Sequence, residues 1–179
     1  MISKRKFSAV SAGAVFAASA AIGLASFSAQ ALGTTTKTAT FLVSLNVQSD
    51  CAITANPLAF GNAGSALAIT AISQNTTLSV TCTTGTNYSV ALDKGTTTGS
   101  LVTARLLVGS GSNTSTVQYQ LYSTSGGSGT IWGDATGGTP VTGTGTGSAV
   151  SLTVYGVVPA QPIPVVDTYT STETATITF

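Results

Sequence analysis

The clearest pattern in the sequence is an alternation of apolar and polar residues between positions 40 and 48. Phe41, Val43, Leu45 and Val47 are apolar at every second position, and apart from Leu42 the residues around them are polar. Successive side chains of a strand point to opposite faces, so this period of two predicts a strand with one buried face.

Short stretches rich in strand-forming residues recur along the rest of the chain. Gly, Asn, Asp, Ser and Pro separate nearly all of them, as turns require. Thr, Ser, Gly and Val dominate, and strong helix formers are scarce, so we predict an all-β sandwich rather than a parallel sheet with crossover helices. The predicted strands span residues 51–54, 58–60, 76–82, 88–92, 101–108, 116–122, 130–132, 149–158 and 169–179.

Two stretches do not have the composition of strands. Residues 135–147 alternate Thr and Gly around Pro140 and predict a flexible loop. Pro159, Pro162 and Pro164 predict an irregular segment before the last strand, because proline cannot donate to a ladder.

The first 31 residues are typical of a secretory signal peptide. A basic start, Lys4 to Lys6, precedes a small apolar run and the triplet Ala29-Gln30-Ala31, which predicts cleavage after Ala31. A retained membrane anchor is the alternative, but Ser, Gly and Ala dilute the run, and no later stretch reaches the ~20 apolar residues of a spanning helix. We therefore expect an exported chain without a membrane span after cleavage.

The two cysteines, Cys51 and Cys82, both follow the predicted leader. An exported chain passes through an oxidising compartment, so we expect them to form a disulfide that stabilises the fold by about 3–4 kcal/mol. Free thiols or bridges between chains are the alternatives. A zinc site has little support, because the chain has no histidine.

Charged residues are too sparse to suggest catalysis. The predicted mature chain keeps three basic and five acidic residues, a net charge of −2 without a basic patch, so nucleic acid is not an expected partner. General acid–base chemistry needs titratable groups that converge, and no spacing here pairs Lys37 or Lys94 with a nucleophilic serine. We expect no enzyme activity, no cofactor and no metal. The charged residues are Lys37, Lys94, Arg105, Asp50, Asp93, Asp134, Asp167 and Glu173.

An ordered set of segments across the predicted mature chain resembles the spore coat U domain proteins, which include the subunits of archaic, Csu-type chaperone-usher pili. The segments are Ala39-Thr40-Phe41-Leu42-Val43-Ser44-Leu45-Asn46-Val47 before Cys51, Leu58-Ala59-Phe60-Gly61, Leu78-Ser79-Val80-Thr81-Cys82, Val154-Tyr155-Gly156, and Asp167-Thr168-Tyr169 through Thr176-Ile177-Thr178-Phe179. The resemblance implies an incomplete immunoglobulin-like sandwich, residues 49–179, completed by a strand from another subunit.

The resemblance also implies roles for both ends of the mature chain. Residues 32–48 would be a donor extension that inserts Phe41, Val43, Leu45 and Val47 into a neighbour's groove. A periplasmic chaperone would fill the groove first, and exchange would take place at an outer-membrane usher, giving a fibre of copies on the cell surface. The last strand would border the groove and be recognised by the chaperone; its residues on that face are Ala175, Ile177 and Phe179.

Two alternatives remain open from the sequence. By periodicity alone, residues 41–47 fit equally well as the first strand of their own closed sandwich, which would suit a secreted coat or matrix protein that does not polymerise. A carbohydrate-binding sandwich could use Trp132, Tyr119 or Tyr122, although lone aromatics usually belong to the core. The length leaves no room for a separate receptor-binding domain, so a shaft or minor subunit fits better than a tip adhesin.

Overall fold

The computed structural model describes residues 33–127 and 129–179, which belong to two units divided between Ser44 and Leu45. The predicted signal peptide lies outside the described residues and stays a prediction. From residue 33 to residue 50 the chain forms neither helix nor strand, so the strand predicted over 41–47 is not formed within this chain. The helices in the described part of the chain are all too short or too polar to cross a membrane.

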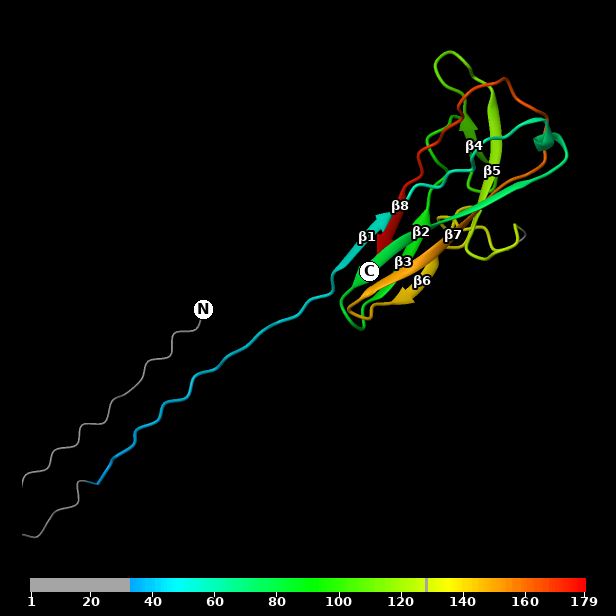
Figure 1. Ribbon diagram of the computed structural model, residues 1–179. Coiled ribbons are helices and arrows are strands. Elements are labelled where there is room, and N and C mark those ends of the chain that lie inside the picture. Colours follow the sequence, from blue (N-terminus) through cyan, green and yellow to red (C-terminus); the bar gives the residue numbers. More distant parts are fainter. Residues whose placement is uncertain (1–32, 128) are drawn as a thin grey trace, which may run out of the picture. The chain divides into compact units, whose positions relative to one another are not determined.

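Within the described residues, eight antiparallel strands form two sheets, which confirms the all-β prediction (Figure 1). The five-stranded sheet has the order β1 (Cys51–Ala55), β2 (Ile72–Cys82), β7 (Ala149–Val158), β5 (Thr116–Tyr122) and β4 (Arg105–Val108). The three-stranded sheet has the order β6 (Val141–Thr144), β3 (Asn87–Leu92) and β8 (Ala175–Thr178). The one helical turn in the part of the chain that the structure describes is η1 (Ser65–Ala68).

The core lies between the two sheets and follows the period of two. Alternate residues of β2 and β3 are buried, with Val80 and Val90 exposed by only 1% and 0%. Trp132 is 1% exposed and donates its indole Nε1–H to the carbonyl of Val90 over 2.8 Å. The buried residues thus come from both sheets and from the segment around Trp132, as expected for a sandwich with one core.

The prediction of a strand over 58–60 is wrong. Leu58 and Phe60 pack against the core as side chains of an irregular segment. A Cβ at Gly156 of β7 would lie 2.5 Å from Leu58 Cδ2 and 2.9 Å from Phe60 Cζ, so the missing side chain makes room for both. The ring of Phe60 meets that of Tyr119 edge to face, with centroids 6.1 Å apart.

The prediction of a flexible loop over 135–147 is also wrong, because it contains β6, paired with β3. The ring of Tyr88 covers Gly143, its partner across the ladder, where a larger residue would collide. Three other predicted strands are shorter than expected: 101–108 begins only at Arg105, 130–132 makes single bridges, and 169–179 is a strand only over Ala175–Thr178. Residues 159–168 are irregular, as predicted.

Candidate functional site

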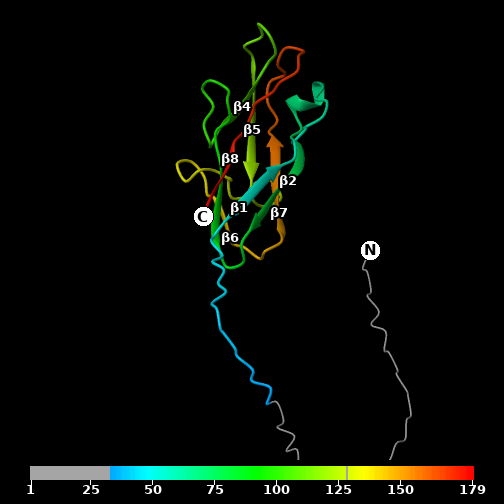
Figure 2. The same cartoon turned by 90° about the vertical axis from the view of Figure 1, so that its left-hand side faces the viewer.

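One side of the sandwich is open, where an edge of each sheet lies next to the other. Strand β1 pairs only with β2, and β8 pairs only with β3. Figures 1 and 2 both show β1 and β8 side by side. No ladder joins these two strands in residues 33–127 and 129–179, so both edges keep backbone donors and acceptors that another strand can bind.

The inward side chains along this side are incompletely covered. On β1, Cys51 and Ile53 are half-buried, and on β8 the same holds for Ala175 and Ile177. The next strands inward, β2 and β3, bury their core residues almost completely. Phe179, after the end of β8, is 55% exposed. We call this pair of unpaired edges, β1 and β8 with their half-buried inward side chains, the open groove, because the groove implied by the family resemblance would lie here.

A disulfide and a threonine fix the start of β1. Cys51 and Cys82 face each other across the β1–β2 ladder and form the predicted disulfide, with their Cα atoms 4.1 Å apart. Thr83 donates its backbone N–H to the Asp50 carbonyl over 2.9 Å and its hydroxyl to the Gln48 carbonyl over 3.2 Å. The chain is therefore held from Gln48 onward, close to the predicted boundary at residue 49.

The side chains of the four predicted donor residues are exposed. Phe41 is 86% exposed, Val43 79%, Leu45 88% and Val47 69%. Large apolar side chains in a continuous exposed run are unusual in a monomeric protein and typically mark a binding segment. The structure thus brings Ala175 and Ile177 to the open groove and leaves the predicted donor residues uncovered.

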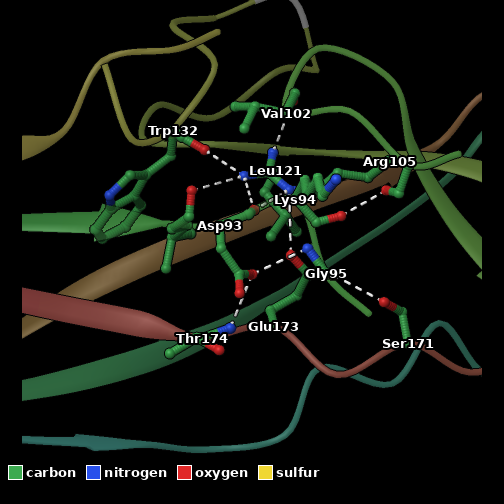
Figure 3. A network of polar contacts seen from close by, with 12 residues as sticks. Asp93, Lys94, Gly95, Val102, Arg105, Leu121, Trp132, Ser171, Glu173 and Thr174 are labelled. Atoms are coloured by element: carbon green, nitrogen blue, oxygen red, sulfur yellow. Dashed lines mark hydrogen bonds and ion pairs between the residues drawn. The ribbon is translucent and has the colours of Figure 1, made fainter. Parts of the chain in front are cut away.

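A buried arginine joins the two sheets next to the start of β8 (Figure 3). Arg105, on β4 of the five-stranded sheet, is 0% exposed. Its guanidinium donates to backbone carbonyls at the end of β3, at 3.2 Å from Leu92 and 2.7 Å from Asp93. It also donates to the Trp132 carbonyl at 2.9 Å and to Gln120 Oε1 at 2.6 Å. The rigid fork of Arg105 therefore connects β4 and β5 to the end of β3.

Glu173, two residues before β8, completes this cluster. Arg105 Nε lies 3.3 Å from Glu173 Oε2, and the hydroxyls of Tyr119 and Ser171 donate to Glu173 Oε1. Burial raises the pKa of the Glu173 carboxyl, an effect larger than the opposing hydrogen bonds and the positive charge of Arg105. Burial also raises the pKa of the Tyr119 hydroxyl. Since Tyr119 is on β5, Glu173 connects the residues just before β8 to the five-stranded sheet.

Asp93 extends the pairing of β3 with β8. Its backbone N–H donates to the Thr174 carbonyl over 3.1 Å, and its carboxylate accepts from the N–H of Thr174 and of Gly95, each over 2.9 Å. Burial opposes ionisation of Asp93, but these hydrogen bonds together lower the pKa of its carboxyl. Gly95 has φ +77, and a Cβ there would collide with Glu173, so only glycine fits without strain. We call Arg105, Glu173, Asp93 and Tyr119 the cross-sheet cluster.

No local pattern in the sequence predicts this cluster. Arg105 and Glu173 are 68 positions apart, and neither belongs to a local motif. The usable signal was that Arg105 sits in an apolar stretch predicted as a strand, where an arginine needs several acceptors.

Comparison with known protein families is decisive for the chain's identity. A model described as the Spore Coat Protein U domain matches residues 37–176, which is most of the chain. The protein belongs to the spore coat protein U domain family. The resemblance noted from its segments is thereby confirmed. Among curated proteins, none matches this spore coat protein U domain by sequence.

A solved structure shares the fold. It is the crystal structure of the CsuC–CsuE chaperone–tip adhesion subunit pre-assembly complex from archaic chaperone-usher Csu pili of Acinetobacter baumannii. The TM-score is 0.53 at 20% identity, and the match covers 74% of this chain and 40% of the other. At this identity the likeness establishes the immunoglobulin-like fold, and the chain spans less than half the length of that relative.

The aromatics suggested for sugar binding do not form a platform in this spore coat protein U domain. Trp132 and Tyr119 are 1% and 3% exposed and belong to the core, and Tyr122 is half-buried. A stacking surface needs exposed ring faces, so the structure speaks against Trp132 and Tyr119 in that role.

A third carboxylate, Asp167, also makes the stability of the domain depend on pH. It accepts hydrogen bonds from Ser110, Asn113 and the Thr168 N–H, which lower its pKa to about 2. A carboxyl with a lowered folded pKa contributes stability above its unfolded pKa, here about 3.8, and loses it as the pH falls toward 2. Because Asp167 is exposed and solvent screens its charge, we expect Asp167→Asn to lower the melting temperature only slightly at pH 7, and by less at pH 2.

Thermal melts at the two pH values check this prediction. Asp50→Asn is the matched control, because the Asp50 side chain is exposed and its carboxylate accepts no hydrogen bond from the described residues. An Asp167→Asn deficit that is equally large at pH 2 would contradict the role of ionised Asp167.

Proposed function

We propose that the protein is a structural subunit of an extracellular pilus, assembled by the chaperone-usher pathway through donor-strand exchange, and that the fibre supports adhesion and biofilm formation. The observation that carries the proposal is the open groove. Two neighbouring sheet edges leave half-buried core residues, Ile53 and Ile177, without a covering strand. A strand of another molecule placed there would complete the core and the backbone pairing.

The donor strand of this proposal comes from another copy of the chain, with Phe41, Val43, Leu45 and Val47 inserted into the groove. Burying four such side chains contributes roughly 6–12 kcal/mol as an upper estimate, before the ladder hydrogen bonds. Their exposure of 69–88% supports this role, because almost all of their apolar surface is available for burial. An interaction of this size suits a fibre whose subunits rarely separate.

The proposal includes a periplasmic chaperone and an outer-membrane usher as partners. An open groove with unpaired edges invites aggregation, so a subunit needs cover before it is assembled. The solved relative is itself a chaperone–subunit pre-assembly complex. The disulfide between Cys51 and Cys82 is consistent with passage through an oxidising compartment.

The C-terminal strand provides a test of chaperone recognition. Deleting Thr178 and Phe179 removes the last pairing of β8, Thr178 with Ser89, together with the exposed phenyl ring that follows the strand. We expect the periplasmic yield to fall several-fold in cells that express the chaperone. Phe179→Leu, which keeps an apolar end, should retain the yield. An unchanged yield of the deletion variant would count against recognition of this strand.

The experiment that tests the proposed function compares periplasmic protein made with and without the cognate chaperone. Size-exclusion chromatography with light scattering gives the mass, and electron microscopy shows the product. We expect a one-to-one chaperone complex, and heat-resistant fibres when the chaperone is absent or displaced. A stable, closed monomer that never polymerises would contradict the proposal and favour a coat or matrix protein.

A further inference from the structure

Strand β8 makes few interactions of its own that would hold it in place. It is four residues long, has β3 as its one partner strand in the described residues, and leaves its other edge in the open groove. Short edge strands with a single partner are the parts of a sheet that fray most easily. Yet this edge has to offer a fixed register of backbone groups if it is to accept a donor strand.

The cross-sheet cluster acts on the residues that lead into β8. Glu173 is held by Arg105 of β4 and by Tyr119 of β5, which face each other in the opposite sheet. Thr174 is held at both its N–H and its carbonyl by Asp93. Arg105 in turn fixes Asp93 through that residue's carbonyl, at 2.9 Å from Nε and 2.7 Å from Nη2.

We infer that Arg105 and Glu173 are positioning residues for the binding of a donor strand. They hold β8 against β3 in the register that places the free backbone groups of β8 for pairing with that strand. The inference rests on the proposed function, since it names the residues that prepare the accepting edge. Figure 3 shows the guanidinium of Arg105 next to Glu173, and the carboxylate of Asp93 next to the backbone N–H of Thr174. Neither Arg105 nor Glu173 has to touch the donor.

A charged hydrogen-bond network suits this task because its geometry is fixed. A buried ion pair gives little net stability, since desolvation of both charges offsets their attraction. Its directional hydrogen bonds nevertheless favour one arrangement of the chain over slightly shifted arrangements. A pre-organised edge lowers the ordering cost of binding, so loosening it should slow strand uptake before it unfolds the domain.

The test uses the chaperone-bound mature chain and a fluorescent peptide with the sequence of residues 33–48. Glu173→Gln removes the charge and keeps the shape, and Asp134→Asn is the matched control on an exposed turn. We expect Glu173→Gln to slow peptide uptake about tenfold and to speed amide exchange in β8 by a similar factor. Exchange in β2 and β7, which report global stability, should stay as in the wild type.

Tyr119→Phe is the second variant, in case Glu173→Gln does not fold. It removes one hydrogen bond to Glu173 and keeps the ring packed against Phe60, so the same changes should appear at smaller size. Uptake as fast as in the Asp134→Asn control, or faster exchange in β2 and β7 to the same extent as in β8, would overturn the inference.

The two ideas fail in different ways. If the wild-type complex takes up no peptide, the proposed function is wrong. Amide exchange then still tests the positioning role. Equal exchange rates in β8 of the wild type and of Glu173→Gln would overturn that role.

Discussion

Replacing Val43 with Asp should abolish fibre formation and leave a chaperone-bound subunit at normal yield. Val43 is 79% exposed, so the substitution removes no contact from the core of its own domain. In a neighbour's groove the same side chain would bury an unpaired carboxylate, which costs several kcal/mol in addition to the ~1.5–3 kcal/mol of lost apolar burial. Electron microscopy and light scattering after removal of the chaperone measure the outcome.

The control lies one residue away. Ser44→Asp adds the same charge on the opposite face of the alternating segment, where a donor strand would meet solvent. It should polymerise almost as the wild type does. Leu45→Asp should repeat the effect of Val43→Asp. Fibres from Val43→Asp in wild-type amounts would show that residues 41–47 are not the donor strand.

Replacing Arg105 with Met should lower the free energy of unfolding by about 3–5 kcal/mol, because it leaves several buried carbonyl groups without their shared hydrogen-bond donor. Glu173 would lose its cation, and the carbonyls of Leu92, Asp93 and Trp132 would lose their donor. Urea unfolding followed by Trp132 fluorescence measures the change. We would make it in the Val43→Asp background, so that polymerisation does not interfere.

Lys94→Met is the matched control for this prediction. It removes the same charge from an exposed side chain in the adjoining loop and should change the stability by less than about 0.5 kcal/mol. If Arg105→Met is no more costly than Lys94→Met, the cluster around Arg105 contributes nothing specific to the fold.

The strands that could be predicted are those whose side chains alternate between core and solvent. Val80 on β2 and Val90 on β3 follow that rule, and both are completely buried. Strand β6 was missed because a Thr- and Gly-rich segment has the composition of a loop, and only its pairing with β3 orders it. The opposite error arose over 58–60, where two apolar side chains reach the core from an irregular backbone.

The candidate site also has features that could be predicted from the sequence and features that could not. The disulfide could be predicted because two cysteines in an exported chain leave one intramolecular pairing, and β1–β2 pairing brings them together. The role of residues 41–47 could not be derived from alternation, because a strand in the chain's own sandwich and a strand offered to a neighbour require the same pattern. The buried pair of Arg105 and Glu173 depends on folding across the two sheets, which no local pattern records.

The most direct measurement of strand exchange is a cross-link from Phe41. Phe41 would be replaced by the photoreactive p-benzoylphenylalanine, which keeps an aromatic side chain at a position that is 86% exposed. Fibres grown from an equal mixture of isotopically light and heavy subunits would be irradiated and analysed by mass spectrometry. We predict cross-links to residues of β1 or β8 that join light to heavy chains. Cross-links confined to chains of one isotope would show that residue 41 binds its own domain, and would contradict donor-strand exchange.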